Sequence, residues 1–203
     1  MLAAWAEQTS TIQFGPLVSC NSYRNPDLLA DMARTVDHIS GGRLVLGIGS
    51  GWNERDYAEF GYDFGTAGQR LDELGEALPR IEKRCAAGNP PPARRIPVLI
   101  GGGGERKTMP LVARHADIWH SFSDLATFVH KSTLLDDRCR ELGCDPSEIR
   151  RSVDAPQGPP AKVATGFAAA GVSLFSIEVS GPNYDLSRVE EWVRWRDSLR
   201  GDE

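Results

Sequence analysis

Four consecutive glycines at residues 101–104 are the feature of this sequence of 203 residues that points most directly to ligand chemistry. They follow an apolar run at residues 96–100 and precede a predicted helix that begins at Thr108. Glycine lets the backbone approach an anion closely, and the free amide groups at a helix start favour negative charge. The pattern predicts a phosphate-binding loop, to which Arg106 and Lys107 add charge and Thr108 a hydroxyl group. The alternative is a flexible turn that needs only positive φ angles.

A second glycine cluster, at residues 47–51, also follows an apolar run, and it ends in Trp52. The indole of Trp52 is suited to stack on a flat ring, or alternatively to pack over the rim of the fold. A third strand end lies at residues 18–21. In parallel α/β folds ligands collect where the strands end, so these three segments are expected to share one face.

The other residues that could do chemistry are less informative. Among the histidines, His120 is the candidate to reach the ligand face, whereas His38, His115 and His130 are interpreted as structural or solvated. No Ser-His-Asp order, HExxH motif or paired acid stands out, so catalytic residues are not assigned and no metal site is expected. The cysteines have neither disulfide nor zinc spacing and are interpreted as free thiols: Cys20, Cys85, Cys139 and Cys144.

Composition narrows the classes of protein. The chain has 23 basic and 28 acidic residues, a net charge of -5, and no basic run that would follow a phosphate backbone, which argues against nucleic acid as a partner. No apolar run reaches the roughly 18 to 20 residues of a membrane span, and the first residues lack the pattern of an export signal. We therefore expect one cytoplasmic globular domain over residues 1–203.

The elements that must position these residues alternate between strands and helices. Strands are predicted at residues 11–20, 43–49, 96–100, 117–121, 148–153 and 172–179. Helices are predicted at residues 26–40, 108–115, 125–142, 163–170 and 187–199, the first of them capped by Asn25. A further helix is predicted to start at a capping box of Thr66 and Gln69, to carry an apolar repeat as far as Ile81 and to kink at Pro79. Apolar strands that alternate with helices predict an α/β fold with a parallel sheet or barrel.

Several segments, in this order, resemble the luciferase-like monooxygenase superfamily, in its deazaflavin (coenzyme F-420)-dependent oxidoreductase branch. The strongest match is DHISGGRL at residues 37–44, which runs into LGIGSGW at residues 46–52. RLDEL at residues 70–74, PVLIGGGGE at residues 97–105 and ADIW at residues 116–119 complete the pattern.

The resemblance implies a TIM-type (β/α)8 barrel that binds a deazaflavin or FMN at its C-terminal face, with coenzyme F-420 favoured over FMN by the SGGRL and GSGW segments. It implies that one strand end lies beside the ring, where the family often has a bulge with a cis peptide. The cofactor-binding residues that it implies are Val18, Ser19, Cys20, Gly49, Ser50, Gly51, Trp52, Gly101, Gly102, Gly103, Gly104 and Glu105.

The chain also departs from the family pattern, because the segment that would form the first two strands is missing. A shortened barrel exposes two unpaired edges, so we expect a homodimer that covers them. The favoured function is a flavin- or deazaflavin-dependent oxidoreductase that transfers a hydride to or from a small organic substrate. The alternatives are a non-catalytic homologue that binds flavin or another subunit, and a barrel that binds a sugar phosphate for isomerase or lyase chemistry.

Overall fold

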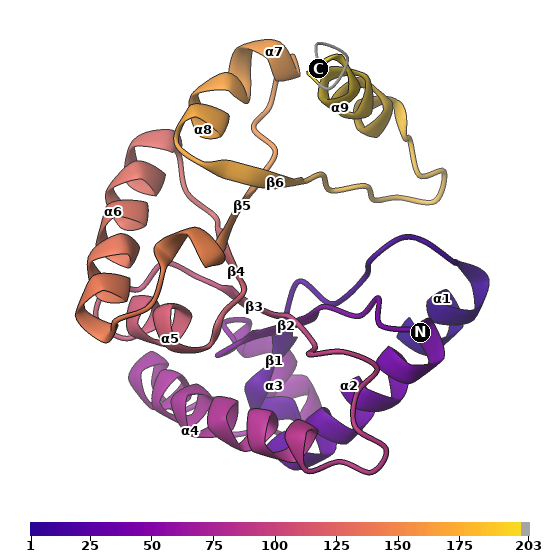
Figure 1. The fold of residues 1–203 in the computed structure, drawn as a ribbon, viewed down its shortest axis with the longest axis vertical. Helices are drawn as coiled ribbons and strands as arrows, with labels where there is room; N and C mark the ends of the chain where they lie inside the picture. The colour runs from indigo at the N-terminus through magenta and orange to yellow at the C-terminus, as the bar shows by residue number, and fades with distance from the viewer. Residues whose placement is uncertain (200–203) are drawn as a thin grey trace.

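The structure, a computed structural model, describes residues 1–199 and contains one parallel sheet with helices around its outer face (Figure 1). The strands are β1 (Ser19–Cys20), β2 (Leu46–Gly49), β3 (Val98–Gly101), β4 (Ile118–Ser121), β5 (Arg150–Asp154) and β6 (Val172–Ser176). They lie side by side in sequence order, and each neighbouring pair is parallel. The predicted parallel α/β architecture is confirmed, and β1 and β6 are the edge strands of the described sheet.

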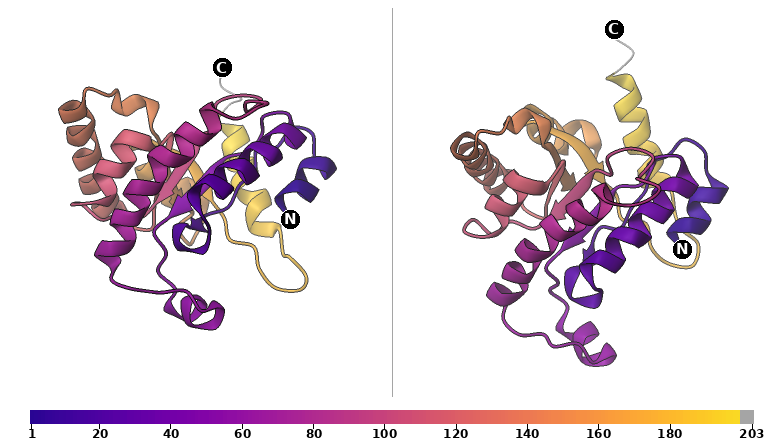
Figure 2. Two further views of the ribbon diagram at one scale, coloured as in Figure 1. Left: turned by 90° about the horizontal axis from the view of Figure 1, so that it is seen from below. Right: turned by 60° about the horizontal axis from the view of Figure 1, so that its bottom comes forward.

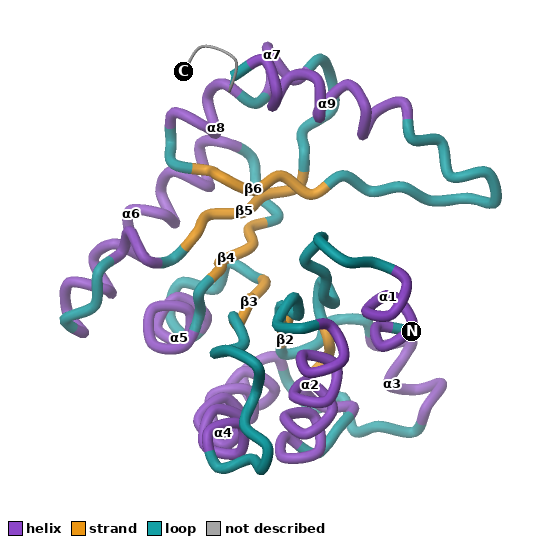
Figure 3. The backbone as a smooth tube through the Cα atoms, turned by 45° about the vertical axis from the view of Figure 1, so that its right-hand side comes forward, coloured by secondary structure: helices purple, strands orange, loops and turns teal. Residues whose placement is uncertain are grey.

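The helices form the outer layer, with the strands inside them (Figure 3). They are α1 (Leu2–Gln8), α2 (Pro26–Ser40), α3 (Glu54–Phe60), α4 (Ala67–Ala86), α5 (Thr108–His115), α6 (Leu125–Leu142), α7 (Pro160–Val163), α8 (Thr165–Ala169) and α9 (Ser187–Ser198), with short 3-10 turns at Asn21–Tyr23 and Pro146–Glu148. None of these helices is long and apolar enough to cross a membrane.

Helix starts were predicted well where a side chain caps them. Asn25 Oδ1 accepts hydrogen bonds from the amides of Asp27 and Leu28 at the start of α2. Thr66 and Gln69 form the predicted capping box of α4, which satisfies amide groups that no helical carbonyl can reach. Pro79 lies inside α4, which continues to Ala86, beyond Ile81, the last position of the predicted apolar repeat.

α1 is absent from the helices predicted above, and two further helical segments differ from the prediction. α3 was missed because its seven residues carry no apolar repeat; acidic residues in its first turn and Gly61 in a left-handed conformation define it instead. The helix predicted at residues 163–170 is divided into α7 and α8, since Pro160 starts a separate short turn earlier in the chain.

The strand predicted at residues 11–20 is interrupted. Phe14 forms an isolated parallel bridge with Leu44, and regular pairing resumes only at β1. Between them the backbone lies unusually close to β2: a Cβ at Gly15 would be 1.9 Å from the carbonyl oxygen of Val45, and one at Gly47 would be 1.8 Å from that of Pro16. Only glycine allows this approach, and the irregular stretch follows from it.

The main core lies between the sheet and the helices. Ile48, Ile100 and Trp119 are paired in register, fully buried and directed toward the helices. Because side chains alternate along a strand, their neighbours Gly47, Gly49 and Leu99 face the interior of the curved sheet. The same alternation directs Ile118, His120, Arg150 and Ser152 into that interior, which is called the lumen below.

Candidate functional site

The strand ends singled out in the sequence meet at one edge of the sheet, the edge formed by the carboxyl ends of the strands. α3, which follows β2, and the segment at residues 177–186, which follows β6, both project from this side (Figure 2). This is the edge where parallel α/β folds hold their ligands.

The glycine loop after β3 is fixed by its neighbour β4. The amide of Gly102 donates to the carbonyl oxygen of His120 at 3.0 Å, and Trp119 Nε1 donates to the carbonyl oxygen of Gly102 at 2.7 Å. Gly102 has a φ of 128°, a conformation that other residues rarely adopt. The ADIW segment therefore helps to hold the loop in place.

Lys131 of α6 brings a positive charge to this loop. A Cβ placed on Gly103 would lie 2.6 Å from Lys131 Nζ, and one on Gly104 would lie 2.8 Å from Thr108 Oγ1. The loop therefore combines backbone without side chains, a hydroxyl group at the start of α5 and an ammonium group. These groups suit a phosphate, so the loop fits the phosphate group of a phosphorylated cofactor.

The other charged residues near the loop are arranged differently from the prediction. Lys107 Nζ is directed toward α4, where it lies 2.6 Å from a carboxylate oxygen of Asp72 and donates to the Gly68 carbonyl oxygen. Arg106 is exposed, and Glu105 lies 3.5 Å from His130. Lys131, which the sequence analysis missed, takes the place expected for Lys107.

Val18 lies where β1, β2 and β3 come together. Its methyl groups would be 2.8 Å from a Cβ on Gly49 and 3.5 Å from one on Gly101, so these two glycines make room for it. The Leu17–Val18 peptide bond is cis, in the place where the resemblance implied one. Ser19 instead faces outward, into a groove that Leu29 and Met32 of α2 also line.

Two buried side chains, one from α3 and one from α4, contact the loop after β2 and fix its position. Tyr57 of α3 contacts Cys20 Sγ at 3.0 Å and donates to Ser22 Oγ, and burial raises the pKa of Tyr57 to about 12. Arg70 of α4 donates to the carbonyl oxygens of Gly51 and Phe64 and stacks on the Phe64 ring at 3.8 Å. These contacts set the path of residues 50–52 beside β1.

Trp52 is 84% exposed and extends from this loop into solvent. The structure thus brings Val18, Gly49 and Gly101 together but not Trp52 and Ser19. The cofactor-binding roles assigned to all these residues remain predictions.

A polar cluster that the sequence analysis did not recognise lies next to the glycine loop. His120 is fully buried; its Nδ1 lies 2.9 Å from Ser152 Oγ, and its Nε2 lies 3.3 Å from Asp154 Oδ1. Ser176 Oγ donates to the same Asp154 oxygen at 2.5 Å. Burial lowers the pKa of His120 and outweighs the opposite effect of Asp154. The described residues contain no group of three or more histidine, cysteine or acidic side chains placed to hold a metal ion.

A curved parallel α/β sheet with a glycine-rich loop at its carboxyl edge is the architecture of barrel-type α/β proteins. Within that class, the chain belongs to the luciferase-like monooxygenase family, whose model matches residues 1–157.

Two curated relatives illustrate the match. An uncharacterised protein of Mycobacterium tuberculosis is 33% identical over 132 residues, which cover 58% of this chain and 47% of that protein. An F-420-dependent glucose-6-phosphate dehydrogenase of Amycolatopsis mediterranei is 28% identical over 132 residues, or 57% of this chain and 38% of the relative. The chain thus spans less than half the length of these relatives.

Solved structures share the fold. An F-420-dependent secondary alcohol dehydrogenase, determined with an F-420–acetone adduct, has a TM-score of 0.77 at 14% identity, covering 91% of this chain and 79% of that one. The oxygenating constituent of a Pseudomonas putida diketocamphane monooxygenase, determined with FMN, has a TM-score of 0.62 at 21% identity, covering 75% of this chain and 51% of that one. The six parallel strands therefore match those of luciferase-like TIM-barrel proteins.

Proposed function

We propose that this chain binds coenzyme F-420, in preference to FMN, and serves as an oxidoreductase that exchanges a hydride between the cofactor and a small organic substrate. The observation that carries the proposal is the glycine loop with Lys131 over Gly103 and Thr108 beside Gly104. The relatives and structures named for F-420 support this cofactor, and the structure with FMN keeps the second one open.

Each part of the site has a role in this proposal. Gly102, Gly103 and Thr108 hold the cofactor phosphate, and Lys131 neutralises its charge. Val18 and the glycines on either side of it present an apolar surface to one face of the ring and exclude water there. When bound, the cofactor supplies the ring carbon that accepts or donates the hydride, while the protein supplies orientation and environment.

The test is a titration of the purified chain with F-420 and, separately, with FMN, followed by absorbance or fluorescence. Saturable binding of F-420 that is tighter than that of FMN is the expected result. Lys131→Gln should weaken F-420 binding about tenfold or more, because a charge-assisted hydrogen bond contributes about 1.5–3 kcal/mol.

Gly103→Val should weaken binding similarly, because its side chain would occupy the place of the Lys131 ammonium group. Gly68→Ala is the matched control, since a Cβ there meets only ordinary contacts at 3.7 Å and beyond. Absence of binding in a folded sample would contradict the proposal. Binding without turnover over a substrate screen would favour the alternative of a non-catalytic cofactor-binding homologue.

A further inference from the structure

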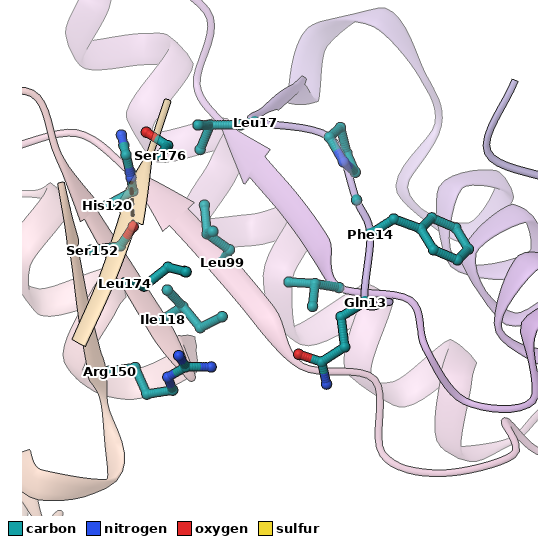
Figure 4. Close-up of a pocket in the computed structure, with 13 residues that line it drawn as sticks. Gln13, Phe14, Leu17, Leu99, Ile118, His120, Arg150, Ser152, Leu174 and Ser176 are labelled. Atoms are coloured by element: carbon teal, nitrogen blue, oxygen red, sulfur yellow. Dashed lines mark hydrogen bonds between the residues drawn. The ribbon is translucent and has the colours of Figure 1, made fainter. Parts of the chain in front are cut away.

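A pocket of about 270 Å³ opens in the lumen beside the glycine loop, between the segment at residues 13–17 and strands β3 to β6 (Figure 4). Its middle is apolar and is lined by Leu99, Ile118 and Leu174. This lumen pocket is small, so it suits a small ligand rather than a cofactor.

The end of the pocket near the carboxyl edge is polar. His120, Ser152 and Ser176 line it, and His120 is fully buried. Ser152 Oγ engages Nδ1, whereas Nε2 lies 3.3 Å from Asp154 Oδ1 without hydrogen-bond geometry and has no other partner among the described residues. A buried ring nitrogen without a partner is unfavourable, and an oxygen atom of a ligand would satisfy it.

The opposite end of the pocket carries a positive charge. Arg150, the first residue of β5, extends its guanidinium group along the pocket below Ile118 (Figure 4). Gln13, in the segment at residues 13–17, faces Arg150. Within residues 1–199, Arg150 forms no ion pair. Its guanidinium group is therefore available to a carboxylate, the group that its planar donors match best.

We propose that the lumen pocket binds a short aliphatic carboxylate that carries a hydroxyl or carbonyl oxygen at its other end. The carboxylate lies at Arg150, the aliphatic chain lies against Leu99 and Ile118, and the oxygen lies at His120 Nε2. The orientation is fixed, because the negative charge of Asp154 repels a carboxylate from the His120 end.

The length of the ligand follows from the strand. Arg150 and Ser152 are two residues apart on β5, where the strand rises about 3.3 Å per residue, so their backbone positions are about 7 Å apart and only a short ligand fits between the two ends. The carbon that bears the oxygen then lies at the carboxyl edge, where the cofactor would be held. That this ligand is the substrate of the site rests on the proposed function.

The experiment measures binding to the chain without cofactor, by saturation-transfer NMR and calorimetry, with γ-hydroxybutyrate, butyrate and n-butanol as probes. We expect γ-hydroxybutyrate to bind most tightly. Arg150→Gln should weaken both acids about tenfold and leave n-butanol unchanged, and His120→Gln should weaken γ-hydroxybutyrate but not butyrate. Arg138→Gln is the matched control, because Arg138 pairs with Glu141 on the surface of α6.

Ser152→Ala provides a second test of the polar end if the His120 variant does not fold. If γ-hydroxybutyrate and n-butanol bind equally well, or if Arg150→Gln binds the acids as tightly as the wild type does, the proposed carboxylate site is wrong. The F-420 titration separates the two proposals: cofactor binding without acid binding overturns the lumen pocket alone, whereas acid binding without cofactor binding overturns the proposed function.

Discussion

Arg70 joins the loop after β2 to the segment between α3 and α4. Its guanidinium group donates to the carbonyl oxygens of Gly51, Phe64 and Gly65, and it is 7% exposed. We predict that Arg70→Met lowers the free energy of unfolding by about 2 kcal/mol, since charged hydrogen bonds are lost while the side-chain volume is kept. Urea denaturation measures this change.

Arg138→Met is the control for Arg70→Met. Arg138 forms an exposed pair with Glu141, so its loss should change the free energy of unfolding by no more than about 0.5 kcal/mol. Equal effects of the two substitutions would show that the buried contacts of Arg70 add nothing to stability.

His120 should make stability depend on pH. Burial lowers its pKa below the ordinary value of 6.5, so the unfolded chain takes up a proton at a higher pH than the folded chain does. The stability associated with a neutral His120 is complete above about pH 6.5 and decreases as the pH falls from there toward the folded pKa.

The measurement compares the free energy of unfolding at about pH 7.5 and about pH 5.5 in the wild type and in His120→Gln. The wild type should lose more stability on acidification than the variant does. His130→Gln is the control, because His130 is an exposed histidine on α6 outside the buried cluster. If the free energy of unfolding changes with pH identically in the wild type and in His120→Gln, His120 does not contribute to the pH dependence of stability.

Single residues also show what the sequence could and could not predict about the site. The glycine loop and Thr108 were found because their types and order are local signals. Lys131 was missed because only the packing of α6 against the loop brings it there. Ser152 lies on the same strand face as Asp154, but the predicted strand ended at residue 153, so the alternation of side chains did not extend to Asp154. Nothing in the sequence placed them beside His120.

At the scale of elements, the capping box of α4 is a direct test of a local signal. Thr66 Oγ1 accepts from the amide of Gln69 at 3.2 Å, and the Gln69 side chain accepts from the amide of Thr66 at 2.8 Å. We predict that Thr66→Ala lowers the free energy of unfolding by about 1 kcal/mol.

Thermal denaturation measures the effect of Thr66→Ala. Thr133→Ala is the control, because Thr133 lies in the middle of α6, where alanine favours the helix. A loss of stability in the control as large as that in Thr66→Ala would show that the capping box has no special role.

The elements that were predicted correctly are those with a regular pattern and a clear boundary. α5 and α6 have the predicted bounds, and β2 to β6 lie within or close to the predicted strands. β1 was overestimated, because apolar composition does not reveal where the backbone must cross β2 closely. α3 was missed because a seven-residue helix carries little periodic signal.

At the scale of the whole molecule, the unpaired edge of β1 and the groove outside it predict self-association. The groove has a volume of about 650 Å³ and is lined by apolar side chains of α1 and α2. Met32 and Trp5 line it and are 45% and 44% exposed. Exposed apolar surface beside an open strand edge favours association with a second copy of the chain.

We predict a dimer at micromolar concentration by sedimentation velocity, and a monomer for Met32→Lys. Leu142→Lys is the control, since Leu142 is similarly exposed, at 42%, on α6. A monomeric wild type, or a dimer that neither substitution affects, would contradict the prediction.

The close crossing of residues 14–17 over β2 has a consequence for sequence variation. At Gly15 and at Gly47 the space for a side chain is filled by a backbone carbonyl oxygen of the other segment. Because every residue type has this oxygen, no second substitution can remove the clash. In a library that randomises both positions and selects for folded protein, glycine should therefore be selected at each position, whichever residue occupies the other.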